Sequence, residues 1–142
     1  MGNDLKGSGF RGLFFWRKTA QNASGEPGET MLRIDSHQLG IAEGSLLLFS
    51  DFQDGGAMWT GKGPRELRRA VEFDEPYLKR PVVQVSLSML DIDSSTNHRV
   101  DISAEMVTQD GFVIVFRTWG DTKIARVRAD WCAFGPVRHE DD

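Results

Sequence analysis

The stretch GFVIVFRTWGDTKIARVRADW, residues 111–131, decides the fold because it holds two runs that alternate with a period of two. The first run places Phe112, Ile114 and Phe116 on one face and Val113 and Val115 on the other. The second run places Val127, Ala129 and Trp131 opposite Arg126, Arg128 and Asp130. This period is typical of β-strands, and the WGDT sequence between the runs is typical of a turn. We therefore expect two strands folded back on each other as a hairpin, with an indole beside polar groups at its tip.

Length and composition indicate one folded domain. The chain has 142 residues, 39% of them hydrophobic and 27% charged, which is typical of a globular protein rather than a disordered one. The net charge of −4 and the pI of about 5.4 argue against nucleic acid as the main partner. The single cysteine, Cys132, excludes a disulfide within one chain, and we expect it to be a buried, inert thiol. No apolar run reaches transmembrane length and no signal peptide is evident.

The first 30 residues differ from the rest in being rich in glycine and lacking any sustained periodicity. We expect a flexible N-terminal tail there and the folded domain at 31–142. Two alternatives stay open. Residues 12–18 are aromatic enough to anchor a partner, and Met31 is a second candidate for the start of the protein.

The remaining chain reads as about six strands with polar turns. An apolar lead-in at 32–41 is either a strand or a helical oligomerisation segment, 44–52 is the expected first strand, and 53–64 is an expected loop. Residues 65–73 are ambiguous, with a strand preferred. The later strands are marked by apolar residues at every second position: Val83, Val85, Leu87 and Met89, then Val100, Ile102, Ala104 and Met106. Alternation with one polar face predicts an all-β, antiparallel β-sandwich.

Charged residues on the expected outer faces form two rows: Arg99, Asp101 and Glu105, and Arg126, Arg128 and Asp130. Plain solvation explains such rows, and so does a symmetric interface in which three or more copies pair their charges. The two readings stay open at this point.

The sequence offers no catalytic constellation. Asp91 and Asp93 lie near hydroxyl residues but lack the calcium-loop pattern, and residues 61–63 are too short for a phosphate-binding loop. His37 has no second metal ligand nearby, and no nucleophile elbow occurs. We therefore expect no enzymatic activity, no cofactor and no metal.

Several dispersed blocks resemble the H-type lectin domain, the domain of snail agglutinins and of the discoidin C-terminal region. The blocks are PVVQVSLSMLD at 81–91, NHRV at 97–100, GF at 111–112, TW at 118–119, DTK at 121–123, and Trp131. They occur in the family's order and spacing between about Phe52 and Gly135. The resemblance implies a six-stranded antiparallel sandwich that assembles as a trimer or a pair of trimers (a hexamer). It also implies that sugars bind in clefts between protomers.

The resemblance further implies a carbohydrate-binding site made of Lys62, Arg99, Trp119, Gly120 and Asp121. Arg99 matches the arginine that hydrogen-bonds sugar hydroxyls in the family, and Trp119 matches the tryptophan at the cleft. Residues 61–66 match the family's loop and the Arg-Glu pair that follows it. The residue types agree, because sugars need an aromatic face and charged hydrogen-bonding groups. If these residues do not bind sugar, we expect Trp119 to cap the turn and Arg99 to form an ion pair with an acidic residue across a trimer axis.

Three positions depart from the snail lectins. Lys62 replaces an aspartate, Gly120 a histidine and Ala125 a tyrosine, which removes polar partners of the sugar. Asp121 and Trp59 are candidate substitutes for the lost contacts. We expect a ligand of galactose or N-acetylgalactosamine type, or an acidic sugar, which a lysine and an arginine at one cleft would favour.

Two functions follow from the resemblance and its departures. The first is a homotrimeric lectin that acts in sugar recognition, such as cell adhesion, as a secreted or surface protein. The second is a structural module, such as a fibre or particle component, that keeps the fold with a degenerate sugar site.

Overall fold

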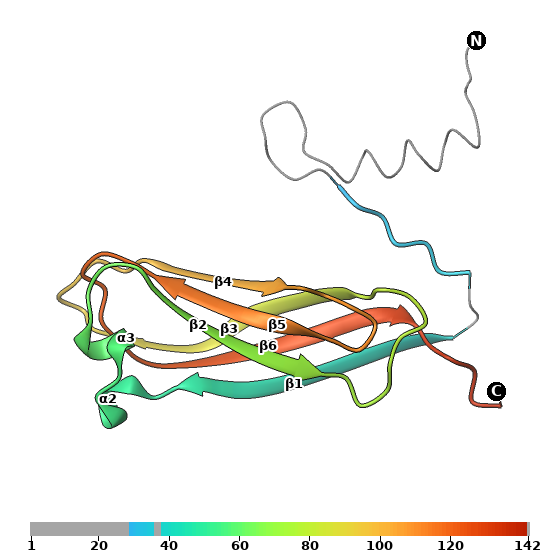
Figure 1. The fold of residues 1–142 in the computed structure, drawn as a ribbon, viewed down its shortest axis with the longest axis horizontal. Coiled ribbons are helices and arrows are strands. Elements are labelled where there is room, and N and C mark those ends of the chain that lie inside the picture. Colours follow the sequence, from blue (N-terminus) through green and yellow to red (C-terminus); the bar gives the residue numbers. More distant parts are fainter. Residues whose placement is uncertain (1–28, 36–37, 142) are drawn as a thin grey trace, which may run out of the picture. The chain divides into compact units, whose positions relative to one another are not determined.

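The structure, a computed structural model, describes residues 29–35 and 38–141. Within these ranges the chain forms β1 (Leu39–Phe49), α2 (Asp51–Asp54), α3 (Ala57–Thr60), β2 (Arg65–Glu72), β3 (Val82–Ile92), β4 (Val100–Glu105), β5 (Gly111–Thr118) and β6 (Ile124–Pro136). Figure 1 shows the strands running along one long axis. The expectations for residues 1–28 and for His37 concern positions outside the described part. No helix in the described ranges is long and apolar enough to cross a membrane.

The strands form two antiparallel three-stranded sheets, ordered β1-β6-β3 and β2-β5-β4. In the first sheet Phe134 of β6 lies between Ile41 and Val82. In the second, Phe116 of β5 lies between Leu67 and Ile102. Two sheets sharing one core make a six-stranded β-sandwich, which confirms the predicted fold class.

The prediction of a hairpin between the two runs of the deciding stretch is wrong. β5 pairs with β2 and β4, whereas β6 pairs with β1 and β3, so residues 119–123 cross from one sheet to the other. Each run is the central strand of its sheet. Phe116 and Val127 are both fully buried. In separate sheets the apolar faces of both runs meet across one core, which buries the most apolar surface.

The core lies between the sheets. Phe49 packs on Phe116 with ring centroids 5.5 Å apart, and Trp131 packs edge-on against Phe112 at 5.3 Å. Burial of each such side chain contributes about 1.5–3 kcal/mol. Trp131 is therefore a structural residue, as its place in the alternation predicts.

The first strand begins earlier and ends earlier than expected, at Leu39 and Phe49 rather than at residues 44 and 52. Gly44 lies inside β1 because the Trp131 ring fills the space of a side chain there. A Cβ on Gly44 would lie 2.6 Å from the Trp131 Nε1. The following loop also holds the short helices α2 and α3, which the glycine-rich sequence does not predict.

The other strands follow their patterns more closely. β2 confirms the strand preferred at 65–73, and β3 points Val83, Val85 and Leu87 inward as predicted. β4 ends one residue early, because Met106 has φ 53° and is 71% exposed instead of continuing the inward alternation.

Most members of the two charged rows find partners within the chain, whereas the Arg99 side chain makes no hydrogen bond or ion pair with a described residue. Arg117, in the middle of its sheet, contacts Glu66 at 3.6 Å, Asp101 at 3.6 Å and Glu105 at 3.0 Å. On the other sheet Arg126 pairs with Asp91 at 3.1 Å. Solvated ion pairs of this kind contribute little stability. A symmetric interface between copies stays a prediction. Cys132 is half-buried, so the expectation of a buried thiol is met only in part.

Candidate functional site

Three connections gather at one end of the sandwich, which we call the helical end (Figure 1). They are residues 50–64 with α2 and α3, residues 93–99 between β3 and β4, and residues 119–123 between β5 and β6. The opposite end carries residues 73–81 and 106–110, and we call it the hollow end. All five site residues predicted from the sequence lie at the helical end.

Gly120 is the point at which the connections meet. Its φ of +71° lies in the left-handed region that favours glycine. Its carbonyl oxygen accepts a hydrogen bond from the Gly63 amide at 2.8 Å and one from the Arg65 guanidinium at 3.2 Å. The loop that carries Lys62 is thereby fixed against the tip of the β5–β6 connection. Lys62 itself is exposed.

Arg65 holds the loop together from within. Its guanidinium also donates to the carbonyls of Gly63 at 2.9 Å, Met58 at 3.2 Å and Ala57 at 3.4 Å. Partial burial lowers the pKa of this guanidinium. A cation shared by four carbonyl oxygens satisfies the C-terminal end of α3, which is too short to be stable alone. Arg65 is therefore a positioning residue.

Two buried threonines place Arg99. The Thr118 hydroxyl donates to the Arg99 carbonyl at 2.5 Å. The Thr122 hydroxyl donates to the Asn97 carbonyl at 2.6 Å and accepts from the Arg99 amide at 3.1 Å. Both side chains are at most 1% exposed. The backbone of residues 97–99 is thus fixed on both sides of the Arg99 Cα, which sets where its side chain leaves the surface.

Asp121 and Arg99 differ in their partners. The Asp121 carboxylate accepts from the Asn97 amide at 3.1 Å, and this bond, aided by the positive charge of Arg99, lowers the pKa of Asp121. Arg99 is half-buried as a residue, and its guanidinium makes no hydrogen bond or ion pair with any described residue. A Cβ placed on Gly120 would lie 3.6 Å from the Arg99 Cδ and Nε, so Arg99 borders Gly120.

Aromatic side chains complete the helical end. Trp119 is 44% exposed, and so is available to a ligand. Trp59 is half-buried, with Phe52 edge-on at 5.0 Å and the Lys123 ammonium 4.5 Å from its ring centroid. These contacts favour packing over ligand contact for Trp59. The buried Ala125 lies within β6.

The residues that position this site carry little signal in the sequence. Thr118, Thr122 and Lys123 stand out there only as parts of matching blocks, and Arg65 only as part of a matched pair. A hydroxyl residue that follows a turn glycine by two positions is too common a pattern to single out Thr122. The geometry offers an exposed aromatic face, a free guanidinium and a fixed carboxylate, which suits a ligand with many hydroxyl groups.

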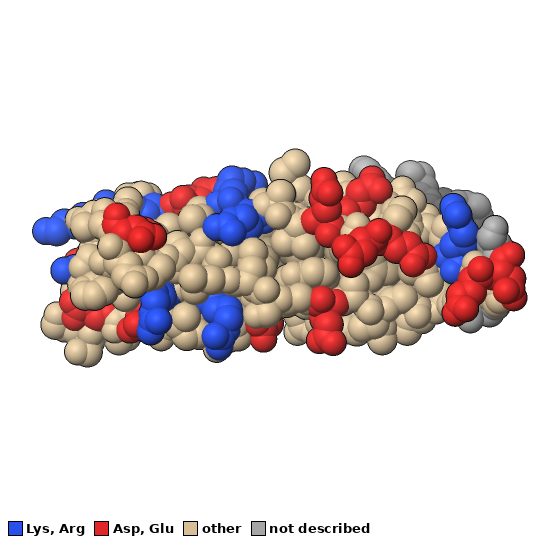
Figure 2. All heavy atoms as spheres, turned by 90° about the horizontal axis from the view of Figure 1, so that it is seen from below, with Lys and Arg blue, Asp and Glu red and all other residues tan. Residues whose placement is uncertain are grey.

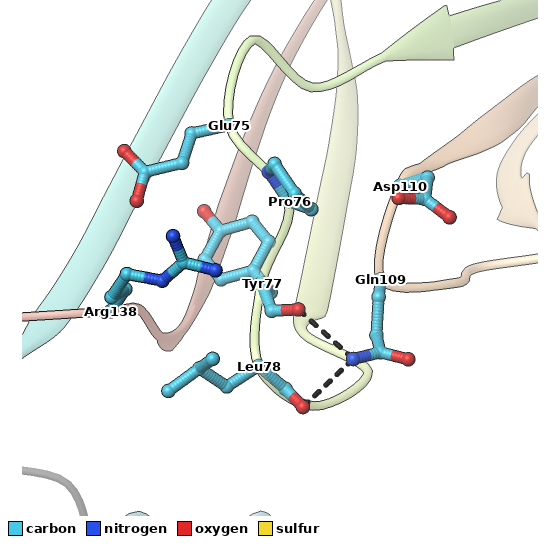
Figure 3. Close-up of a pocket in the computed structure, with 7 residues that line it drawn as sticks. All are labelled: Glu75, Pro76, Tyr77, Leu78, Gln109, Asp110 and Arg138. Carbon is cyan, nitrogen blue, oxygen red and sulfur yellow. Dashed lines mark hydrogen bonds between the residues drawn. The ribbon is translucent and has the colours of Figure 1, made fainter. Parts of the chain in front are cut away.

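Described residues of the hollow end line a cavity of about 430 Å³ and another of about 350 Å³, and both cavities include Glu75 and Tyr77. Figure 3 shows the larger one, in which the Gln109 amide donates to the carbonyls of Tyr77 and Leu78 at 3.1 and 2.8 Å. Acidic residues line both cavities: Glu43, Glu72, Asp74, Glu75 and Asp110, with Arg138 as the cation of the larger one. Figure 2 shows acidic side chains gathered on this part of the surface. No residue predicted from the sequence to bind sugar lies here.

Comparison with known proteins identifies a domain family that matches part of the chain. The model of the H-type lectin domain matches residues 68–134. A protein of Fuscovulum blasticum described as "ATP synthase subunits region ORF 7" is 59% identical over 112 residues, covering 79% of this chain and 96% of that protein. A discoidin-1 chain of Dictyostelium discoideum is 33% identical over 81 residues, 56% of this chain.

The solved structures agree on the fold. Discoidin II of Dictyostelium discoideum superposes with a TM-score of 0.61 at 20% identity, covering 75% of this chain and 40% of that one. The match covers 32% of the discoidin-1 chain, so this protein corresponds to a part of the discoidins. The family match, the discoidin relatives and the shared sandwich agree: residues 68–134 of this chain match the H-type lectin domain, and the chain has the fold of the discoidin structures.

Proposed function

We propose that this protein is a non-enzymatic lectin that binds a glycan at the helical end, in clefts between the protomers of a homotrimer. One observation carries the proposal. Two buried threonines hold the backbone of Arg99, and its side chain borders Gly120, the residue that follows the exposed Trp119. The Arg99 guanidinium makes no hydrogen bond or ion pair with a described residue. A positioned but unsatisfied donor next to an aromatic face is typical of a binding site rather than of a structural contact.

The residues divide the recognition of a sugar between them. The indole of Trp119 suits the apolar C–H face of a pyranose ring, since aromatic faces pack against such surfaces. Arg99 donates to ring hydroxyls, and Asp121, with its pKa lowered by the Asn97 amide, accepts from them as a carboxylate. The loop at 61–64, fixed to Gly120, closes one side.

A neighbouring protomer would supply the other wall of the cleft. The outer face of β1-β6-β3 supports self-association, because it exposes apolar side chains that water does not favour. Ile41 is 63% exposed, Leu39 52% and Val82 48%. Light scattering after size-exclusion chromatography tests the assembly, with a trimer or a pair of trimers expected for the full chain and a smaller species for Ile41→Gln.

A glycan array with the full chain tests the function. We expect specific hits for the native protein and their loss in Arg99→Ala and Trp119→Ala, with the oligomer preserved. Arg138→Ala is the matched control, because Arg138 is an exposed arginine at the hollow end. It is expected to bind as the native protein does.

An array without hits from a well-folded oligomer would contradict the lectin and favour the second candidate, a structural module with a degenerate sugar site. The replacements at Lys62, Gly120 and Ala125 are the observation that favours this candidate.

A further inference from the structure

At the tip of the helical end, formed by residues 61–64, 93–99 and 119–123, the acidic and the cationic side chains differ in whether they bond to other residues of the chain. Residues 61–64, 93–99 and 119–123 contain two acids, Asp93 and Asp121, and three cations, Lys62, Arg99 and Lys123. Both acids are occupied by donors of the chain itself. Asp93 accepts from the Ser95 amide and hydroxyl, each at 2.8 Å, and Asp121 accepts from the Asn97 amide at 3.1 Å.

The cations are used differently. Neither Arg99 nor Lys62 makes a hydrogen bond or ion pair through its side chain within the described residues. The ammonium of Lys123 lies 4.5 Å from the Trp59 ring centroid, a contact that leaves its N–H donors unsatisfied. The Arg99 side chain borders Gly120, and Lys62 directly precedes Gly63, whose amide bonds to the Gly120 carbonyl. The tip therefore presents free cationic donors, while its carboxylates are already satisfied.

We propose that this site selects glycans carrying an anionic group, a sugar carboxylate or a sulfate ester, with Lys62 and Arg99 as its partners. The inference rests on the proposed lectin function and names the ligand class of the same site. An anionic oxygen bonded by a guanidinium adds ion-pair attraction to the hydrogen bond, which a neutral hydroxyl does not provide. The planar fork of Arg99 also matches a carboxylate or sulfate with two parallel hydrogen bonds.

Gly120 contributes by what it lacks. The Cβ position of Gly120 lies 3.6 Å from the Arg99 Cδ and Nε, so a larger side chain there would lie over the guanidinium. With glycine the guanidinium stays accessible to a ligand group. A histidine at this position would instead offer its imidazole ring as the hydrogen-bonding partner of a neutral sugar.

Three matched probes test the inference: immobilised lactose, 3′-sulfated lactose and 3′-sialyllactose, each measured with the full chain by biolayer interferometry. We expect both anionic probes to bind roughly tenfold or more tightly than lactose, the range that one charge-assisted hydrogen bond supplies. Raising the salt concentration from about 0.05 to about 0.5 M should shrink this preference. A stronger response to the sulfated or to the sialylated probe identifies which anion the site takes.

Variants locate the preference. Lys62→Gln should weaken the binding of both anionic probes by a larger factor than the binding of lactose. Because Lys62 is exposed, this substitution should leave the fold intact. Lys79→Gln is the control, because Lys79 is an exposed lysine at the hollow end, paired with Asp35 at 3.8 Å. It should leave all three probes unchanged.

The outcomes separate the two proposals. Equal binding of the three probes, or an anionic preference that persists in Lys62→Gln and in Arg99→Gln, overturns the anionic selection and leaves the lectin function standing. Binding of none of the probes, together with no hits on the array, overturns both.

Discussion

The two ends of this sandwich are built on the same six strands and differ in what their connections do with polar groups. At the helical end the connections bond to one another through Gly120 and Thr122, and the cations Lys62 and Arg99 are left for a ligand. At the hollow end Gln109 joins the connections, and acidic side chains line the cavities. The strands decide where connections lie, and the connections decide the charge and chemistry of each end.

The largest effect on stability and glycan binding is expected for Arg65→Met at the helical end. This substitution keeps the apolar stem and removes the guanidinium that is hydrogen-bonded to four carbonyl oxygens. Loss of these bonds should lower the free energy of unfolding by about 1.5–3 kcal/mol, the scale of hydrogen bonds to charged groups. Glycan binding should also be lost as residues 61–64 detach from Gly120. Urea denaturation and the glycan array measure the two effects.

Arg138→Met at the hollow end is the matched control for this change. Its side chain is exposed, so the expected change in unfolding free energy is within about 0.5 kcal/mol, with binding intact. Equal effects of the two variants would mean that Arg65 does not position the helical end.

Thr122→Val removes a hydroxyl without changing side-chain volume much. The native hydroxyl donates to the Asn97 carbonyl and accepts from the Arg99 amide in a fully buried position. We expect a loss of about 1–2 kcal/mol of unfolding free energy and weaker glycan binding, because Arg99 is no longer fixed.

Thr108→Val is the counterpart at the hollow end, where the hydroxyl also donates to a carbonyl and accepts from an amide. Thr108 is exposed, so water replaces the lost bonds and stability changes less. Weakened glycan binding in Thr108→Val would contradict the assignment of the site to the helical end.

A smaller effect is expected for Gly120→Ala. Gly120 and Gly55 have almost the same φ, +71° and +70°, so alanine at either position should destabilise the fold by about 1 kcal/mol. Only Gly120→Ala should weaken glycan binding, since a Cβ at Gly55 meets nothing within 4 Å among the described atoms, whereas one at Gly120 reaches Arg99. Calorimetry and the array compare the pair, and equal binding would show that Gly120 is only a turn glycine.

The smallest expected effect is the contribution of Asp121 to the pH dependence of the unfolding free energy. The pKa of Asp121 is lowered in the folded state by the Asn97 hydrogen bond, so its contribution to stability is present above the ordinary aspartate pKa of about 4 and is lost as pH falls below it. Asp121→Asn should therefore narrow the difference in unfolding free energy between about pH 6 and about pH 3. Asp110→Asn is the control at the hollow end, since the Asp110 carboxylate accepts no hydrogen bond from a described residue. If this pH-dependent difference in unfolding free energy narrows in Asp110→Asn but not in Asp121→Asn, the expected role of Asp121 is wrong.

Much of the fold follows from the sequence, because alternation reports which face of a strand is buried. It correctly marks β3, β5 and β6, and β4 as far as Glu105. Alternation does not report which strand pairs with which, and this is why residues 111–131 look like a hairpin although their two strands lie in different sheets. The expected start of β1 is too late for a related reason. Glycine usually marks the end of a strand, but Gly44 lies within β1 and makes room for the ring of Trp131, which is distant in the sequence.

The candidate site is predictable in part. The resemblance names Lys62, Arg99, Trp119, Gly120 and Asp121, and the structure places all five at one end. Their supports were not predictable, because Arg65 and Thr122 act through contacts with residues 55 and 23–25 positions away in the chain. The free state of Arg99 and the occupied state of Asp121 likewise depend on which neighbours the fold brings near.

The central claim is that the helical end, and not the hollow end, binds the glycan. Hydrogen–deuterium exchange of the full chain, with and without the tightest glycan from the array, tests it most directly. We expect slower exchange in residues 61–64, 93–99 and 119–123, with exchange in residues 73–81 and 106–110 unchanged. Protection confined to the hollow-end segments, or no protection at either end with glycan bound, would contradict it.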